Sequence, residues 1–562
     1  MNRSRFQRHH RTGFLAGLIA GAILTVAMII LSRGFGLFSL PELVGYRIIA
    51  LMPLATFSLL VETFGPNAKQ LLLVGTTIGQ VLVGGLLGIL WASFASTVPG
   101  EARDKRRMPS LWNANLPGGL FFAIFLFLFV EILLFPAVGA GALGVELPQG
   151  LGPNAAALAI LAACYGAVLA SLYRALMAPA DALAEEAAPR ASAAPSLTRR
   201  QVLVRAILGA AALAVGAGAI FGVTRTPSGQ AAGRRSGRVG NGDLPPEITP
   251  TEDFYHVSKN FVDPKVAEEG WSLQIGGMVE RPYSLTLAEI KALPAVTEYR
   301  TLACISNEIG GDLISNAGWK GVRLKDLLEK AGVKAGAVDI ALSARDGYAE
   351  SFPIEKALSP DVLAVYEMNG APLRDDHGFP IRLLVPDIFG MKNVKWLAKI
   401  EVVNYDYKGF WQEQGWSDTA IVKTMSRIDF PRHRALLPVG VNRLGGVAFA
   451  GGRGVTKIEA SGDGGKTWRE ATIRRPLGPY TWVLWTANLD LAEGEHNLSV
   501  RATDGNGETQ TDRIRPTLPD GSTGWHTITV RAAPGAPAPS PAAVASEQVA
   551  IGTPALRGLY TP

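Results

Sequence analysis

Long apolar segments fill the first part of the chain, and mixed apolar and polar positions follow from about residue 225. Apolar runs lie near 13–32, 48–64, 70–95, 118–138 and 155–177, and again near 202–223. Most of them approach the ~20 residues that a helix needs to cross a bilayer. The second run is the weakest, because Pro53 interrupts it and Arg47 and Glu62 flank it closely. The pattern predicts N-terminal transmembrane α-helices, with a membrane region of about five apolar helices over 1–177.

The residues after 177 predict two linkers with one more helix between them. Residues 178–198 are rich in Ala, Pro and Glu, and residues 225–250 in Gly, Pro and Arg, which is typical of linkers. Between them, 199–224 is expected to form a sixth apolar helix. Its start, Ser196-Leu-Thr-Arg-Arg-Gln-Val-Leu203, resembles a twin-arginine export signal in an internal position. Two ordinary basic residues before a membrane helix explain the same letters, so both interpretations stay open.

Two soluble regions follow. Residues 251–415 mix strand-like and helix-like patterns, which predicts an α+β domain. The expected strands lie near 271–275, 338–342 and 381–385, and the short helices near 286–293 and 324–331. Residues 416–533 alternate strand-like runs with turns such as Gly462-Asp-Gly-Gly465, so we expect a C-terminal immunoglobulin-like β-sandwich. Residues 534–562 are rich in Ala, Pro and Ser, which predicts a disordered tail.

The net charge of +6 carries an orientation signal and does not indicate nucleic-acid binding. Basic residues cluster beside the apolar runs, before residue 12, at 101–107 and at 190–205, where positive charge favours the cytoplasmic side. If the last two loops are cytoplasmic, the sixth helix places the soluble regions on the extracytoplasmic (periplasmic) side of the cell membrane. The N-terminal patch conflicts with this, since three predicted spans separate it from 101–107. Either one of the first three runs is re-entrant, or one patch breaks the rule.

Cys304 is the one cysteine outside the apolar runs, since the other, Cys164, lies inside the run at 155–177. A lone thiol cannot build a disulfide framework or a multi-cysteine zinc or iron–sulfur site, and the chain has no CxxCH motif for covalent haem. Such a cysteine acts as a nucleophile, serves as the single thiolate ligand of a metal, or fills a core as a small hydrophobe.

The motifs around Cys304 distinguish these roles. Six of them follow in order: Tyr299-Arg-Thr-Leu-Ala-Cys-Ile-Ser-Asn307, Gly318-Trp-Lys-Gly-Val-Arg-Leu324, Arg345-Asp-Gly-Tyr348, Tyr366-Glu-Met-Asn-Gly-Ala-Pro-Leu373, His377-Gly-Phe-Pro-Ile-Arg382 and Gly390-Met-Lys-Asn-Val-Lys-Trp396. In this order they resemble the molybdopterin-binding domain of the sulfite oxidase family. The upstream Asp253-Phe-Tyr-His-Val-Ser-Lys-Asn260 and the later Lys457-Ile-Glu-Ala-Ser-Gly-Asp-Gly-Gly-Lys-Thr-Trp468 extend the resemblance over about 251–532.

The resemblance implies a molybdenum–molybdopterin cofactor and two-electron oxygen-atom transfer. Cys304 is then the one protein ligand of the metal, because a thiolate is a soft ligand suited to such a centre. His377 and Arg382 match the family's contacts to the pterin phosphate, for which the paired donors of arginine are well suited. Lys395, with Asn393 and Lys392 nearby, matches the family's phosphate-binding turn.

Further site residues are implied by the same resemblance. Asn260 matches an asparagine at the pocket entrance, and Lys259 stands where relatives often carry arginine. Tyr366 matches a tyrosine on the substrate side of the metal, which helps to couple proton and electron movement. Arg453, in Gly451-Gly-Arg-Gly454, resembles a β-domain arginine that reaches the substrate pocket in sulfite-oxidising relatives.

One departure concerns the substrate. Sulfite-oxidising members typically continue from the cysteine as Cys-Ala-Gly-Asn-Arg-Arg, whereas this chain keeps Asn307 and has Glu308 and Ile309 in place of the arginines. A carboxylate where an anion-binding guanidinium is expected repels sulfite, unless it points away from the metal. A reductase of oxidised sulfur compounds, of the sulfoxide type, is therefore the alternative on the same fold.

Electrons need a separate partner. None of the seven histidines lies within the apolar runs as bounded above, so no axial pair for a b-type haem is expected, and neither is an iron–sulfur cluster. We therefore expect a small-molecule substrate and a cytochrome or membrane redox protein as the electron-transfer partner. Relatives often dimerise through the β-domain, which makes a homodimer an expectation. A cofactor-free membrane binding module is the remaining alternative, against which the retained Cys304, His377, Arg382 and Lys395 argue.

Overall fold

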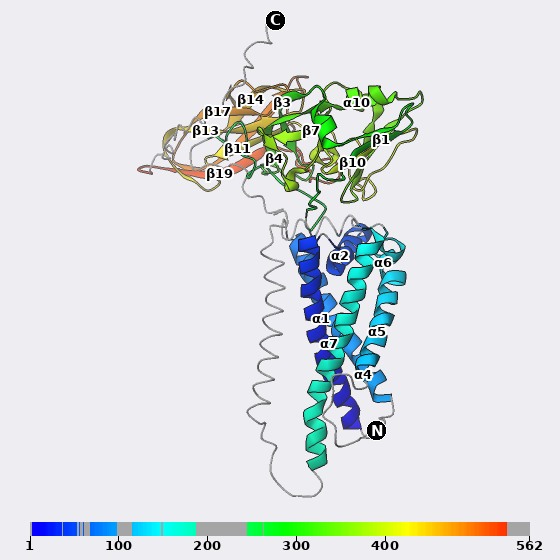
Figure 1. The fold of residues 1–562 in the computed structure, drawn as a ribbon. Coiled ribbons are helices and arrows are strands. Elements are labelled where there is room, and N and C mark those ends of the chain that lie inside the picture. The colour runs from blue at the N-terminus through cyan, green and yellow to red at the C-terminus, as the bar shows by residue number, and fades with distance from the viewer. Residues whose placement is uncertain are drawn as a thin grey trace.

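The computed structural model describes residues 3–35, 37–52, 68–97, 115–145, 150–186, 244–261 and 263–536, with single positions at 56, 60, 64 and 147. A bundle of helices forms one part, and two β-rich units lie beyond one end of it (Figure 1). The predicted sixth helix at 199–224 lies outside the described residues. So do 187–198 and 225–243 of the two predicted linkers and most of the predicted tail.

The helical region has four long helices and several short ones: α1 (Arg3–Phe35), α2 (Leu40–Leu51), α4 (Ala68–Thr97), α5 (Asn115–Phe129), η2 (Val130–Leu134), α6 (Phe135–Ala137), η3 (Ala142–Gly144) and α7 (Leu151–Glu186). Four stretches of the described residues are long and apolar enough to cross a membrane: Gln7–Phe35, Ala68–Phe94, Gly118–Ala137 and Leu151–Met177. They correspond to four of the five predicted spans. The fifth, at 48–64, falls largely outside the described residues.

Helix α7 continues to Glu186, so the predicted linker at 178–198 begins as helix. The physical reason is composition, because the Ala, Leu and Glu of this stretch are strong helix formers. Helices α1 and α4 pack closely through glycines spaced four residues apart. A Cβ atom on Gly17 would lie 2.3 Å from Gly84 O, and one on Gly88 would lie 2.1 Å from Gly13 O. Small residues at this spacing allow close backbone contact in membranes.

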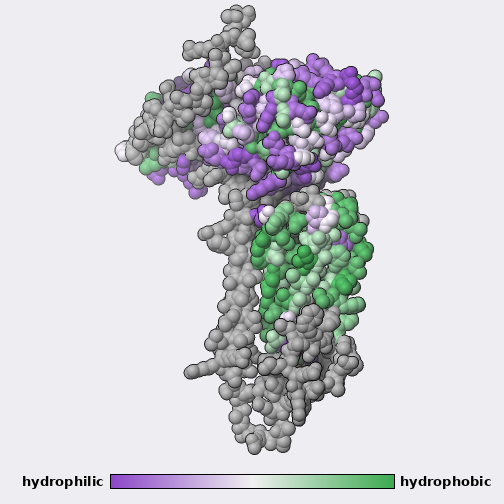
Figure 2. Space-filling view, in the orientation of Figure 1, coloured by the Kyte–Doolittle hydropathy of each residue, from purple (hydrophilic) through white to green (hydrophobic). Residues whose placement is uncertain are grey.

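The outer surface of the helical region is largely apolar, whereas that of the β-rich units is largely polar (Figure 2). Large apolar side chains of α5, including Phe121, Ile124 and Phe125, are exposed. A face of this kind is stable only against lipid or another apolar partner.

The first soluble unit is α+β, as predicted. Its first sheet has the order β2-β1-β10-β5-β6, from β1 (Leu273–Gly277), β2 (Tyr283–Leu285), β5 (Asp339–Ala344), β6 (Ala349–Pro353) and β10 (Leu397–Val403). Its second has the order β3-β4-β7-β8 with β9 on β7, from β3 (Val296–Ala303), β4 (Ile314–Arg323), β7 (Leu363–Met368), β8 (Ala371–Pro372) and β9 (Arg382–Leu384). The helices are α9 (Leu287–Lys291), α10 (Leu324–Ala331) and α11 (Ile354–Ala357).

The second soluble unit is built from two sheets. One has the order β11-β13-β17-β16, from β11 (Met425–Phe430), β13 (Gly440–Phe449), β16 (Thr472–Ile473) and β17 (Val483–Leu491). The other has the order β12-β19-β18-β14-β15, from β12 (Leu436–Pro438), β14 (Val455–Ser461), β15 (Arg469–Glu470), β18 (Gly494–Asp504) and β19 (His526–Ala533). Residues of both sheets, such as Trp485 and Val500, share one apolar core. The β-rich architecture agrees with the prediction, while the immunoglobulin type stays a prediction.

Candidate functional site

Cys304 follows directly after β3 and opens the loop to β4. Its N–H donates to Leu313 O at 2.9 Å, and its carbonyl accepts from Asn307 N–H at 3.1 Å, which fixes the loop. The thiol is buried and lies 3.0 Å from Ser306 Oγ. Burial raises the pKa of the Cys304 thiol, because a thiolate is poorly solvated there. A bound metal cation is a usual means of holding such a sulfur deprotonated.

Two tyrosines, the buried Tyr348 and the partly buried Tyr255, lie within electrostatic reach of this sulfur. Burial is the main cause that raises the pKa of Tyr255 and of Tyr348, and the charge of Cys304 raises both further. The Tyr348 hydroxyl lies 3.0 Å from Glu350 Oε2 and 2.8 Å from Met391 O. The family resemblance assigns a role to neither tyrosine, although both stand in motifs that carry it: Tyr255 in 253–260 and Tyr348 in 345–348.

Three basic side chains from the His377-to-Lys395 stretch gather in the same unit, and we call His377, Arg382 and Lys395 the cation group. Arg382, on β9, is buried and donates to His377 O at 3.3 Å and Asn393 O at 3.4 Å. His377 Nε2 lies 2.9 Å from Thr251 O. Within the described part of the chain, Arg382 Nε has no hydrogen-bond partner.

The cation group carries buried positive charge that nearby carboxylates do not neutralise directly. Lys395 Nζ lies 3.1 Å from His256 Nε2 and donates to Asp376 O at 2.9 Å. Burial lowers the pKa of Lys395 to about 8, that of Arg382 to about 10 and that of His377 to about 4. At pH 7 the positive charge of the group therefore comes from Arg382 and Lys395, and His377 is a neutral member of it. Buried cations cost free energy unless an anion compensates them. The arrangement suits an anionic ligand such as a phosphate.

Residues 256–260 and Asp263 lie beside this group. Lys259 Nζ donates to Asp346 O at 2.8 Å and to Asn260 Oδ1 at 3.0 Å. Asn260 Nδ2 donates to Asp346 Oδ2 at 2.6 Å. His256 pairs with Asp263 at 2.7 Å and also contacts Lys395. The structure therefore brings the two predicted entrance residues to the turn that precedes Tyr348.

Two predicted neighbours of Lys395 have structural partners of their own. The Asn393 amide donates to Phe389 O at 3.2 Å and Ile388 O at 3.4 Å, and its oxygen accepts from Val385 N at 2.7 Å. Lys392 is buried and forms a 3.0 Å ion pair with the buried Glu350. These contacts hold the turn in shape.

Tyr366 and Arg453 are placed differently from the residues above. Tyr366 is buried on β7, with Lys320 Nζ 5.8 Å from its ring centroid. The tyrosines whose pKa the charge of Cys304 raises are instead Tyr255 and Tyr348. Arg453 pairs with Asp504 at 2.9 Å and donates to Val422 O at 3.1 Å, all within residues after β10.

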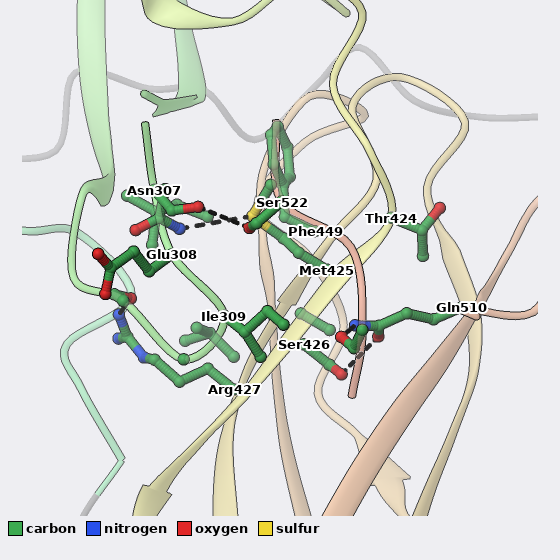
Figure 3. Close-up of a pocket in the computed structure, with 16 residues that line it drawn as sticks. Asn307, Glu308, Ile309, Thr424, Met425, Ser426, Arg427, Phe449, Gln510 and Ser522 are labelled. Atoms are coloured by element: carbon green, nitrogen blue, oxygen red, sulfur yellow. Dashed lines mark hydrogen bonds between the residues drawn. The ribbon is translucent and has the colours of Figure 1, made fainter. Parts of the chain in front are cut away.

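Glu308 and Ile309 border a recess between the two soluble units (Figure 3). Met425, Ser426 and Arg427 of the second unit line the side opposite Glu308 and Ile309. Glu308 is exposed, whereas Arg427 is buried and donates to Gly311 O at 2.7 Å. Cys304 is not among the lining residues of the recess. Glu308 and Ile309, which replace the arginines typical of sulfite-oxidising members, therefore lie at the junction between the two soluble units.

Comparisons with known proteins match both soluble units. The family model "Oxidoreductase molybdopterin binding domain" matches residues 260–411, and "Mo-co oxidoreductase dimerisation domain" matches residues 419–533. Sulfite oxidase of Gallus gallus is 32% identical over 321 residues, which cover 48% of this chain and 69% of that protein. Sulfite oxidase of Arabidopsis thaliana is 27% identical over 350 residues, 50% of this chain and 88% of that protein.

A solved structure also matches. The sulfane dehydrogenase SoxCD from Paracoccus pantotrophus has 25% sequence identity and a TM-score of 0.46, over 50% of this chain and 81% of that chain. The family models begin at residue 260, so the helical region lies outside them.

Proposed function

Because this chain belongs to the sulfite oxidase family of molybdenum-cofactor oxidoreductases, we propose that it transfers an oxygen atom and two electrons at one molybdenum centre held by Cys304. The single observation that carries the assignment of the site is the cation group beside Cys304. Arg382 is buried, its Nε has no partner in the described part of the chain, and Tyr255 lies within electrostatic reach of both Arg382 and Cys304.

The residues fit the cofactor. Cys304 would hold the metal, and Arg382, His377 and Lys395 would hold the pterin phosphate through charge-assisted hydrogen bonds. Lys259 and Asn260 would line the entrance to the pocket. Asn393 would act by fixing the turn, since its amide is fully engaged by backbone groups. When bound, the cofactor supplies a metal that accepts or donates two electrons together with an oxygen atom.

Side chains of this chain place a hydrogen-bond donor near Cys304 and exclude water from its sulfur. Tyr255 and Tyr348 keep their protons at ordinary pH, because burial raises the pKa of both phenols. The Tyr348 hydroxyl donates to Glu350 and to Met391 O, so of the two it is the Tyr255 hydroxyl that is available as a hydrogen-bond donor near the sulfur of Cys304. The surrounding apolar packing keeps bulk water from the sulfur, which strengthens those electrostatic interactions. Tyr366 stays a prediction from the family resemblance alone.

The substrate has two candidates. Sulfite oxidation follows from the family, and reduction of an oxidised sulfur compound such as a sulfoxide is the second candidate, because Glu308 stands where sulfite-oxidising members carry arginine. Steady-state assays with sulfite and with a sulfoxide panel separate them. Glu308→Gln removes the negative charge with little change of size. If sulfite reaches the metal past the recess that Glu308 borders, this variant should lower its KM about two- to five-fold, and if the substrate is neutral, KM should not move.

We further propose a multi-pass membrane anchor with the catalytic unit on the extracytoplasmic side. His9 Nδ1 lies 2.6 Å from the Tyr173 hydroxyl and His10 Nε2 lies 3.3 Å from Ser93 Oγ, so the start of α1 lies beside the ends of α4 and α7. Figure 1 places that end opposite the soluble units. The basic stretches at 101–107 and 190–205 follow α4 and α7, and positive charge favours the cytoplasmic side.

This proposed orientation agrees with the charge pattern if the run at 48–64 does not cross the membrane. Two described spans, α1 and α4, separate the N-terminal basic patch from 101–107, and two is even. A protease site inserted at residue 187 should be protected in intact spheroplasts, whereas one inserted after residue 536 should be cut. Cleavage at 187 from outside would contradict the orientation.

Partners are proposed on two grounds. The family model of residues 419–533 is named for dimerisation, which supports a homodimer through the β-sheet unit. Electrons then pass to or from a separate cytochrome or membrane redox protein. The mass of the detergent-solubilised chain tests the dimer, and reduction or oxidation of added cytochrome c during turnover tests the electron route.

A further inference from the structure

The segment 258–261 contacts helices α2 and α4, at the end of the helical region that we call its head. Phe261 N–H donates to the Tyr46 hydroxyl of α2 at 2.9 Å, and Lys69 Nζ of α4 donates to Ser258 O at 3.1 Å. These bonds cross more than 180 residues of sequence and join the membrane-type helices to the first soluble unit. Two backbone groups of one short segment are thus satisfied by the helices.

Apolar packing reinforces this contact. Phe261 is only 2% exposed, and its ring lies 5.0 Å from the Tyr46 ring, centroid to centroid. A Cβ atom at Gly45 would lie 2.9 Å from the Phe261 ring, so the helix approaches as closely as glycine permits. Leu73 of α4 joins the same buried cluster. The side chain is therefore held in a socket made by α2 and α4.

The intervening residues of the same segment face the cofactor pocket. Lys259 and Asn260 bond to Asp346, at 2.8 Å and 2.6 Å, as described above. His256 and Asp263, which flank the segment, connect to Lys395 of the cation group through the His256 ring. The Lys259 ammonium also lies 5.4 Å from the Tyr46 ring centroid. A displacement of the helix head must therefore move Lys259 and Asn260.

We propose that the helical region completes the cofactor site, with Tyr46 and Lys69 as positioning residues for Lys259 and Asn260. This inference rests on the proposed function, because it takes the cation group as the place of the pterin phosphate. It assigns the helices a role beyond anchoring, since the pocket wall is shaped where they meet the soluble unit. Burial raises the pKa of Tyr46, so its hydroxyl stays neutral and remains available as an acceptor for Phe261 N–H.

The test uses the full chain in detergent, produced in a cofactor-competent host and in a host that makes no cofactor. Tyr46→Phe removes one acceptor and keeps the ring, so amide exchange over 257–263 should accelerate about five-fold in both preparations. In the loaded protein, molybdenum should be lost about five-fold faster during dialysis. Lys69→Met should act in the same direction, and Lys69→Arg, which keeps a charged donor, should restore retention.

Tyr165→Phe is the matched control, because the Tyr165 hydroxyl also makes one buried bond, to Gly84 O at 2.8 Å, but inside the helical region. This variant should leave both the exchange over 257–263 and molybdenum retention unchanged. The inference is overturned if Tyr46→Phe and Lys69→Met retain molybdenum like the loaded wild type. It is also overturned if Tyr165→Phe loses molybdenum equally fast. A wild type that takes up no molybdenum would instead refute the proposed function, and the exchange result in cofactor-free protein would still be readable.

Discussion

Lys392 and Lys395 lie on one turn, but they serve two different regions of the molecule. Lys392 contacts strand β6 of the first sheet, where it pairs with the buried Glu350 at 3.0 Å and donates to Ser351 O at 2.6 Å. Lys395 points into the pocket, where its contacts are the His256 ring and a backbone carbonyl of Asp376. Lys392 is fully buried and Lys395 is partly buried, and of the two only Lys392 has an ion-pair partner among the described residues.

The difference distinguishes a charge that stabilises the fold through an ion pair from a charge that is compensated only when an anionic ligand binds. A buried ion pair whose members satisfy each other contributes little further chemistry, although breaking it is costly. A buried cation among other cations is costly until an anion arrives, which means that its site is built for the anion. Four predictions test this contrast, and they run from the largest expected effect to the smallest.

The largest effect is expected at the metal ligand. Cys304→Ser should abolish oxidoreductase activity, by at least about a hundred-fold, because the metal loses its one protein thiolate. The chain should stay folded, since serine occupies slightly less volume and Ser306 is a ready hydrogen-bond partner. Turnover and circular dichroism measured on the same preparation check this. Activity near that of the wild type would exclude Cys304 as the ligand.

Next is Lys392→Met, which leaves the Glu350 carboxylate buried without its partner. Breaking a buried pair costs about 3–5 kcal/mol, so the free energy of unfolding of the first soluble unit should fall by about that amount. Denaturant titration of the full chain, followed by tryptophan fluorescence, measures the change. A shift below 1 kcal/mol (roughly the value of an exposed pair) would show that the pair is not structural.

Lys395→Met should show the reverse pattern. The variant relieves an uncompensated buried charge, so stability of the cofactor-free chain should change little or rise. Cofactor retention should fall by about ten-fold or more, because a charged hydrogen bond contributes about 1.5–3 kcal/mol. Pterin fluorescence of protein after gel filtration measures retention. If Lys392→Met and Lys395→Met lose pterin equally, the contrast between the two lysines fails.

The smallest effect is a pH dependence of anion binding. Burial lowers the pKa of Lys395 from 10.5 to about 8, so this ammonium loses its proton as pH rises through about 8. Binding of an anion is therefore favoured below that pH and weakens above it. Sulfate, whose own charge is constant in this range, should bind the cofactor-free chain about ten-fold more weakly at pH 9 than at pH 7. Calorimetry should find this slope absent in Lys395→Met.

Much of the fold and of the candidate site could be predicted from the sequence, because the informative patterns are local. The helices at 286–293 and 324–331 were expected from periodicity, and they appear as α9 and α10. Cys304 was singled out by its isolation and by the motifs on either side of it. The cation group followed from one short stretch that contains His377, Arg382 and Lys395.

The rest depends on contacts between distant residues. The partner of Lys392, Glu350, precedes it by 42 positions, and no local pattern links the two residues. The sequence therefore predicts the same phosphate-binding turn for Lys392 and Lys395 and does not distinguish their roles. The tyrosines coupled to Cys304 are Tyr255 and Tyr348, from segments on either side of the cysteine, whereas the resemblance pointed to Tyr366. The contact of Tyr46 with Phe261 spans 215 positions and has no local signature.

The helical region was harder to predict for a different reason. Apolar runs reveal length, yet they do not reveal whether a short run crosses a membrane or lies at one end of a bundle. The run at 48–64 was counted as a span, and α2, which overlaps its start, ends at Leu51. Whether an even or an odd number of spans separates the N-terminal basic patch from 101–107 depends on that one segment.

The most direct test of the central claim is the metal and pterin content of the full-length chain purified from a cofactor-competent host. The claim is that Cys304 and the cation group together hold a molybdenum pyranopterin. We expect stoichiometric molybdenum and pterin in the wild type, with pterin but little molybdenum in Cys304→Ser, and little of either in Lys395→Met. A wild-type chain that is folded and contains neither molybdenum nor pterin would contradict the account.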